Sequence, residues 1–195
     1  MPRSFPQSLT KNDFAYMQLR QLILTGELEP GSPLQQGRLA EEMGVSTTPL
    51  REAIRRLNSE GLITLAAHRD ARVAEVTRSE AEDLYAVRQK LDPLAAELAA
   101  TNHTTAEMEG ILEAEAQLTP LTSGGNIDAL LAHREFHRRI YRASHNEILI
   151  DMLERIWDKA DRYRIIGLRR RGDSIEESTR VADEHHELAM AIRSR

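Results

Sequence analysis

The stretch from Gly44 to Leu62, GVSTTPLREAIRRLNSEGL, predicts a sharp turn followed by one amphipathic helix. Its apolar residues recur at helical spacing and form a stripe that a helix would bury: Leu50, Ala53, Ile54 and Leu57. The opposite side carries cations and short hydrogen-bonding groups: Thr47, Arg51, Arg55 and Asn58. This face suits the edge of a nucleic acid, although the helix alone fits an ordinary solvated basic face equally well.

The ends of this helix carry boundary signals. Ser46, Thr47 and Thr48 can each cap the first turn, where Pro49 loses nothing by lacking an N–H group. Glu60-Gly61 is typical of a helix end. Gly44, which has no Cβ, can take the positive φ that a sharp corner before the helix requires.

The residues on either side predict a winged helix-turn-helix, made of three helices and a β-hairpin. The two preceding helices are expected from Asn12 or Asp13 to about Thr25, and from Arg38 to Met43. After the helix, segments 62–65 and 72–76 have strand character and flank a polar tip at 67–70, which predicts the wing. In such folds the second helix of the motif enters the major groove, and basic residues of the wing meet backbone phosphates.

Charge is distributed unevenly along the chain, whose formal net charge is -5. Residues 1–76 hold nine basic and nine acidic side chains, whereas residues 77–195 hold 17 and 22. The segment 46–72 has five arginines against three acids, a local basic patch of the kind that nucleic-acid binding needs. The chain has no cysteine, which excludes disulfides, thiol catalysis and cysteine-based zinc sites. With no long apolar run and no signal-peptide pattern, we expect a cytoplasmic protein without a membrane partner.

Three segments of this N-terminal region resemble the winged helix of the GntR family of bacterial transcription regulators: LRQLILTGELEPGSPL, LAEEMGVSTTPLREAIRRLNSEGLI and HRDARVAEV. The resemblance implies that Arg51 makes the central DNA contact. The other DNA-binding candidates are Arg38, Thr47, Thr48, Arg55, Arg69 and Arg72. Two positions depart from the family pattern: Thr47 stands where Arg is frequent, and Asp70 where the wing tip usually has Gly. The charge of Asp70 would repel phosphate, so the wing contact is the less secure one.

The rest of the chain predicts an all-helical antiparallel bundle, so the fold class is mainly α. Thr77 and Glu80 have capping-box spacing before a helix to about Thr101, and further helices are expected near 104–118, 126–144, 146–167 and 175–193. The domain prediction is a flexible arm at 1–11, a DNA-binding domain at 12–76, and a domain for effector binding and dimerisation at 77–195.

Histidines in the bundle predict possible metal chemistry. His133 and His137 lie one helical turn apart, and His185 and His186 lie on the last predicted helix. A metalloprotease would need Glu directly after the first His, and Arg134 stands there. A pair of helical histidines is more often structural than liganding, but a third His from a neighbouring helix favours a site.

A second resemblance covers this bundle. The segments VRQKLDPLAAELAA, HREFHRRIYRASHN and DEHHELAMAI resemble the FCD effector domain, which commonly binds a divalent metal through one Asp and three His. The resemblance implies ligands at His133, His137 and His185, with His133 where the Asp usually stands. Zinc is the expected metal, with nickel or manganese as alternatives. The family's last His would lie beyond Arg195, so we expect either residues beyond that position, or water, Glu184 or an effector carboxylate, to complete the site.

The same resemblance implies an effector cavity. Arg88 is the main candidate for holding a carboxylate, with Tyr85, Arg142 and Asn146 as further candidates. From the residues alone, an exposed ion pair between Arg88 and Asp92 is equally compatible.

The leading functional hypothesis is a homodimeric transcription regulator, expected to be a repressor and not an enzyme. It would bind an inverted-repeat operator in double-stranded DNA and respond to a small carboxylate bound beside the metal. The alternatives are a helical domain that only dimerises, and a metal-dependent enzyme fused to a winged helix.

Overall fold

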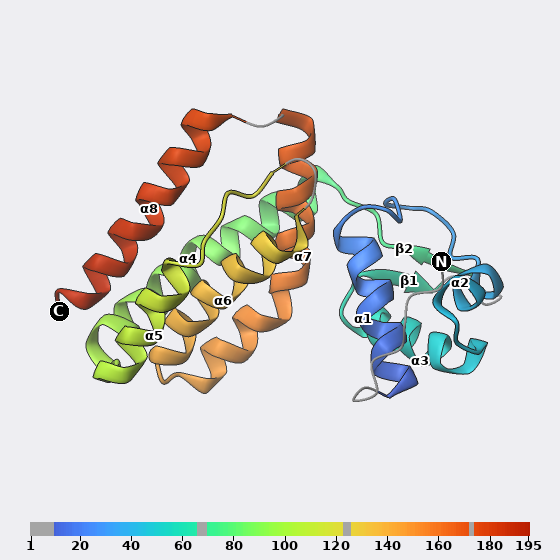
Figure 1. Cartoon of the computed structure of the whole chain (residues 1–195), viewed down its shortest axis with the longest axis horizontal. Helices are drawn as coiled ribbons and strands as arrows, with labels where there is room; N and C mark the ends of the chain where they lie inside the picture. Colours follow the sequence, from blue (N-terminus) through green and yellow to red (C-terminus); the bar gives the residue numbers. More distant parts are fainter. Residues whose placement is uncertain (1–9, 66–69, 123–125, 172–173) are drawn as a thin grey trace. The chain divides into compact units, whose positions relative to one another are not determined.

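The computed structural model describes residues 10–65, 70–122, 126–171 and 174–195. The chain divides between Thr77 and Arg78 into two compact units, each considered by itself below. The N-terminal unit contains α1 (Lys11–Leu24), α2 (Gln36–Met43), α3 (Thr47–Ser59), β1 (Ile63–Leu65) and β2 (Ala71–Val73) (Figure 1). The C-terminal unit contains α4 (Arg78–Asn102), α5 (Thr105–Glu115), α6 (Ile127–Ala143), α7 (Glu147–Arg171) and α8 (Ile175–Arg193).

The first two helices begin earlier than the sequence predicts. The cap of α1 is Thr10, whose hydroxyl accepts from the Asp13 N–H, so Asn12 and Asp13 lie inside the helix. α2 starts at Gln36, two residues before the predicted Arg38. Thr10 is thus a favourable cap that the prediction passed over, whereas Gln35, the N-cap of α2, forms no side-chain cap hydrogen bond.

The turn and α3 follow the prediction. Gly44 has φ 66° and caps α2 with its backbone N–H, which is the left-handed corner that a residue without Cβ permits. Ser46 is the N-cap of α3 and Glu60 its C-cap. The predicted apolar stripe is buried in a core shared with α1, α2 and the hairpin: Leu50, Ala53, Ile54 and Leu57.

The wing is a short antiparallel hairpin in which Ile63 pairs with Val73. The segment before α2 lies along its second strand: Pro33 forms a bridge with Arg72, and Leu34 N–H donates to the Ala71 carbonyl at 2.8 Å. The sequence predicted only a turn there. Asn58, expected on the DNA face, is half-buried and donates instead to the Ile63 carbonyl at 2.8 Å, tying α3 to the wing.

The C-terminal unit is the predicted helical bundle. Its helices α4 to α7 run beside one another, with α8 along one side (Figure 1). Two clusters of buried side chains hold them together, one around Phe136, Ile111 and Ile192, and one around Tyr141, Leu153 and Trp157. A winged helix-turn-helix followed by an all-helical bundle is therefore the fold, and the mainly α prediction is confirmed. None of the described helices has the length and apolar composition needed to cross a bilayer.

Candidate functional site

The outer face of α3 presents the predicted DNA-reading side chains. Thr47, Thr48, Arg51 and Arg55 are all exposed. The helix is held from behind by its buried stripe and by Arg56, whose guanidinium lies 3.7 Å from the centre of the Tyr16 ring on α1. A rigid support of this kind lets a short polar face keep its shape when it enters a groove.

The candidate arginines differ in their partners. Arg38 is paired with Glu42 and Arg55 with Glu52, each at 2.7 Å, so carboxylates partly neutralise them. Arg51 donates through Nε to the neutral Oε1 of Gln36 at 3.3 Å. This contact does not use the two terminal nitrogens of the exposed Arg51, which are the pair that a bidentate contact to guanine uses. The sequence analysis did not single out Gln36.

The wing is harder to assign to DNA. Arg72 is exposed, but its guanidinium donates to the Gly31 carbonyl at 3.1 Å and so also fastens the hairpin to the loop before α2. Asp70 is exposed at the start of the second strand. Arg69 lies outside the described residues, so its predicted phosphate contact stays a prediction.

The three predicted metal ligands meet inside the bundle. His133 and His137 come from α6 and His185 from α8, with ring centres 4.6, 5.0 and 5.3 Å apart. Each ring offers one nitrogen, and these three nitrogens lie within 4.8 Å of one another. His133 is buried and the other two are half-buried. The packing of α8 against the bundle therefore brings together residues 48 and 52 positions apart in the sequence.

Hydrogen bonds orient the cluster for cation binding. His185 donates from Nδ1 to the Val181 carbonyl at 2.5 Å, which leaves its Nε2 lone pair facing the Nε2 of His137 at 3.3 Å. Zn–N bonds of about 2.0–2.1 Å at a tetrahedral ion place two ligand nitrogens about 3.3–3.4 Å apart. The donor set and its spacing therefore fit a divalent metal.

Burial keeps two of these imidazoles neutral. It lowers the pKa of His133 far below its ordinary value, and the nearby Arg164 guanidinium acts in the same direction. Burial is also the main cause that lowers the pKa of His137 well below its ordinary value, and the neighbouring His185 adds to this effect. Neutral rings retain the lone pairs that a metal needs, so protons compete little for this site near neutral pH.

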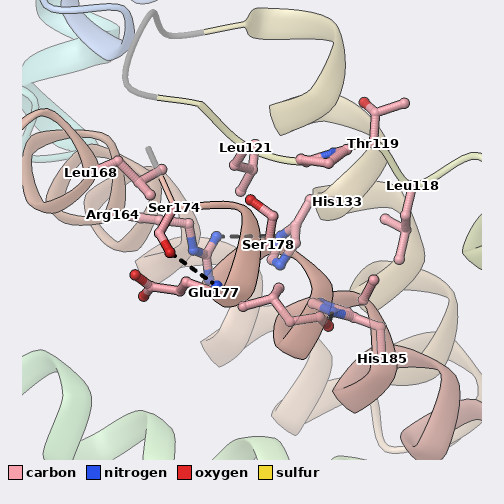
Figure 2. A pocket seen from close by; sticks show the side chains of 13 residues that line it. Leu118, Thr119, Leu121, His133, Arg164, Leu168, Ser174, Glu177, Ser178 and His185 are labelled. Atoms are coloured by element: carbon pink, nitrogen blue, oxygen red, sulfur yellow. Dashed lines mark hydrogen bonds between the residues drawn. The ribbon is translucent and has the colours of Figure 1, made fainter. Parts of the chain in front are cut away.

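A cavity of about 200 Å³ opens beside the cluster (Figure 2). Its lining comes from α6, α7, α8 and the segment before α6: Leu118, Thr119, Pro120, Leu121, His133, Arg164, Leu168, Ser174, Glu177, Ser178, Val181, Ala182 and His185. The wall is mainly apolar, with one guanidinium, one carboxylate and several hydroxyl groups. That combination suits a small, partly charged molecule.

Arg164 is fixed by a buried ionic network. Its terminal nitrogen donates to Asp161 at 3.1 Å, and Asp161, fully buried, also accepts from Arg134 at 2.6 Å. Arg134 pairs in addition with Asp158. Burial raises the pKa of Asp161 while the two guanidiniums oppose that rise. The sequence analysis missed this network because charged residues on a long helix usually face water.

The family comparison agrees with both halves of the structure. Residues 11–73 match the bacterial regulatory proteins of the gntR family, and residues 83–195 match the FCD domain. The chain belongs to the GntR family, in the branch that carries an FCD domain. It is accordingly a DNA-binding transcription regulator, and the enzyme alternative is set aside.

Individual relatives of this GntR regulator are also named as transcription regulators. The HTH-type transcriptional repressor GlaR of Escherichia coli is 28% identical over 92% of this chain and 84% of its own length. The HTH-type transcriptional regulator McbR of the same species is 31% identical over 71% of this chain and 63% of its own length. The solved structure of E. coli McbR/YncC superimposes with a TM-score of 0.75 at 26% identity, covering 95% of this chain and 87% of that one.

Within this GntR regulator, the predicted effector residues do not line the cavity. Arg88 is buried and paired with Asp92 at 2.9 Å, so the alternative ion pair exists but is not exposed. Its guanidinium also lies 5.0 Å from the Trp157 ring, behind the histidines. Tyr85 is exposed on α4.

The remaining candidates have other positions. Arg142 is exposed near the end of α6. Asn146 accepts from the Leu149 N–H at 3.1 Å and so caps α7, which its position before that helix signals in retrospect. Glu184, suggested as a completing ligand, is exposed and paired with Arg180. Contact of any of these with an effector stays a prediction, whereas Arg164 and Glu177 are the charged residues that reach the cavity.

Proposed function

We propose that this regulator is a repressor that binds an inverted-repeat operator as a homodimer and releases it when a small carboxylate binds. The carboxylate would lie in the FCD cavity beside a divalent metal, zinc in the first place, with nickel or manganese as alternatives. The name of its relative GlaR, a transcriptional repressor, supports this direction of regulation. A bacterial chromosome as target makes the cytoplasm the compartment in which we expect it to act.

The operator would be read by α3. Arg51 would donate both terminal nitrogens to a guanine, while Thr47 and Thr48, exposed in the first turn, reach adjacent bases or phosphates. Arg38, Arg55 and Arg72 would contribute phosphate contacts and thus affinity more than sequence choice. A two-fold dimer presents two such helices, which is why we expect two half-sites in inverted orientation.

The metal would be held by His133, His137 and His185. A bound divalent ion with three protein ligands keeps a position open for one oxygen of a carboxylate. Val181 orients His185 through its carbonyl, and the buried position of His133 keeps water from surrounding the site.

The second anchor for the carboxylate would be Arg164. Its guanidinium lines the cavity, and Ser178 lies on the facing helix with a hydroxyl that can donate to an anion (Figure 2). A cavity of about 200 Å³ has room for a molecule of a few carbon atoms rather than a long chain. Glu177, the carboxylate of the lining, would disfavour ligands that carry negative charge at that end of the cavity.

Dimerisation would use α4 and α7, which pack against each other. Val87 and Leu94 on α4 are 46% and 42% exposed, and Ile148 and Met152 on α7 are 76% and 46% exposed. Large apolar side chains at helical spacing on adjacent helices are typical of a surface covered by a second copy. Effector binding would then alter the spacing of the two α3 helices by favouring one dimer arrangement.

The observation that carries the ligand-response proposal is the three-histidine cluster facing a cavity that contains an arginine. Full-length protein purified without a histidine tag should contain about one equivalent of metal by elemental analysis, and a His137→Ala/His185→Ala double variant should contain none. His186→Ala is the matched control, because His186 is exposed on the same helix and bonded to Glu115.

The response is tested with a duplex selected by the wild-type protein from a random library. Within a panel of mono- and dicarboxylates, at least one should lower affinity for this duplex in the wild type and not in the double variant. Wild-type protein without metal, and with operator affinity unchanged by every carboxylate, would support the alternative in which the helical unit only dimerises.

A further inference from the structure

Arg164 contacts one of the three metal-site histidines directly. Its terminal nitrogen lies 3.3 Å from Nδ1 of His133 (Figure 2). The same nitrogen lies 3.1 Å from the Asp161 carboxylate. The side chain is 22% exposed and belongs to the cavity wall, whereas the carboxyl group of Asp161 is fully buried. The same terminal nitrogen thus bridges the buried Asp161 carboxylate and His133, and the guanidinium also borders the cavity.

This contact determines which nitrogen of His133 carries its proton. A guanidinium has donors and no acceptor, so Nδ1 of His133 must accept from Arg164 and the proton of the neutral ring must lie on Nε2. In that state Nδ1 is engaged by Arg164 and Nε2 is protonated, so neither nitrogen is free to bind a metal. His185 differs, because its Nδ1 donates to the Val181 carbonyl and its Nε2 is available.

The carboxylates around the cluster are already engaged. Asp161 accepts from Arg134 and Arg164, Asp158 pairs with Arg134, and Asp92 pairs with Arg88. Within the described part of the chain, the carboxylate that lines the cavity is Glu177, which pairs with Arg180 at 3.9 Å and lies eight residues before His185, thus about 12 Å away along α8. A cation held by three neutral rings would therefore add positive charge beside Arg164 without a carboxylate close enough to balance it.

We infer that Arg164 is a regulatory residue of this site: it competes with a divalent cation for His133, and its displacement by the cation makes its guanidinium available to an anion in the cavity. The inference rests on the proposed metal site and deepens it. Because the same side chain opposes the cation and attracts the anion, the two ligands bind cooperatively, each raising the affinity for the other. The metal-free protein would then hold carboxylates poorly.

The test compares three full-length proteins without histidine tags: wild type, Arg164→Met, and the control Arg138→Met. Arg138 lies on α6 directly after His137, donates to Glu154 at 2.8 Å and is not among the residues that line the cavity. Zinc is titrated after chelation and followed by calorimetry and by the fluorescence of Trp157. That residue is the protein's single tryptophan, and its ring centre lies 5.5 Å from that of His137.

Changes to the groups around metal ligands alter metal affinity by about 10- to 100-fold, usually as a loss. Because Arg164 opposes the cation, we expect the opposite direction here, with Arg164→Met binding zinc about tenfold more tightly than wild type. Succinate should raise the zinc affinity of wild type and of Arg138→Met, and should have little effect on Arg164→Met. If Arg164→Met does not fold, Arg164→Lys is used instead. Its ammonium ends one bond short of the terminal nitrogen that contacts both His133 and Asp161, so Arg164→Lys should also bind zinc more tightly while its charge retains the succinate effect.

The outcomes distinguish failure of the Arg164 inference from failure of the proposed metal site. Zinc affinity that is equal in wild type and in the folded Arg164 variant, or weaker in the variant, overturns the role of Arg164 and leaves the histidine site intact. Zinc binding by neither protein overturns the proposed metal site, and the inference with it. Zinc binding by the variant alone supports the competition directly, because only the removal of Arg164 has then freed His133.

Discussion

Replacement of Arg51 by Ala removes the contact that should read one base of the operator. Its Nε is occupied by Gln36 at 3.3 Å, so the two terminal nitrogens are the groups that would pair with guanine. A good bidentate contact of this kind discriminates by about 1–3 kcal/mol. The dissociation constant should therefore rise by about 5- to 150-fold on the preferred duplex.

The stability of the protein should hardly change in Arg51→Ala. Arg51 and Gln36 are not buried, and such surface substitutions usually alter the free energy of unfolding by no more than about 0.5 kcal/mol. Circular dichroism and the melting temperature of the variant should therefore match those of the wild type. A loss of binding without unfolding separates base recognition from a folding defect.

The assay is fluorescence anisotropy with the selected duplex and with duplexes that carry each of the other bases at every position in turn. Wild type should prefer guanine at one position of each half-site, and Arg51→Ala should lose that preference. Arg193→Ala, which removes the same charge from the end of α8, is the control for non-specific electrostatics. Retention of the full base preference by Arg51→Ala would refute the assignment of this arginine as the central contact.

Three further predictions concern stability and assembly. Gly44→Ala should lower the stability of the N-terminal unit by about 1–2 kcal/mol in thermal unfolding, because the φ of 66° is strained for a residue with a Cβ. The added Cβ would meet no atom within 4 Å, so no steric clash adds to this cost. Thr104→Ala should cost about 1 kcal/mol, because its hydroxyl and backbone form a capping box with Glu107. Hydrogen bonds from the Thr104 backbone N–H and, to a smaller extent, from His145 lower the pKa of Glu107 to about 2. The stability contributed by ionised Glu107 should therefore be fully present above about pH 4.5 and be lost as the pH falls towards 2, as measured by urea unfolding at each pH. Ile148→Glu should convert dimer to folded monomer in light scattering, whereas Met17→Glu, which changes another exposed apolar residue, should not.

Local signals in the sequence were sufficient for the elements of the DNA-binding unit. The apolar spacing in α3 predicted the residues that are buried, and Gly44 predicted the left-handed corner, because both depend on a few neighbouring residues. The predicted starts of α1 and α2 were wrong by one to two residues. Thr10 is a favourable cap that the sequence analysis passed over, and α2 begins at Gln36 after Gln35, whose side chain forms no cap hydrogen bond.

Contacts between distant segments were not predictable in this way. The pairing of residues 31–34 with the wing and the turning of Asn58 towards Ile63 depend on how the hairpin folds back on α3. The burial of Arg134 and Asp161 likewise depends on which face of α7 meets α6. A sequence pattern gives the period of a helix but not the neighbour that its charged face will meet.

The histidine cluster illustrates which features the sequence determines and which depend on the tertiary structure. The sequence by itself determined that His133 and His137 share one face of a helix, because residues four apart lie one turn apart. The resemblance to the FCD domain implied His185 as their partner, and the structure brings the three together. Only the tertiary structure decided that Arg164 contacts His133 and that Arg88 and Asn146 have other partners. These positions follow from the packing of α6, α7 and α8, in which buried polar groups had to find partners across helices far apart in the chain.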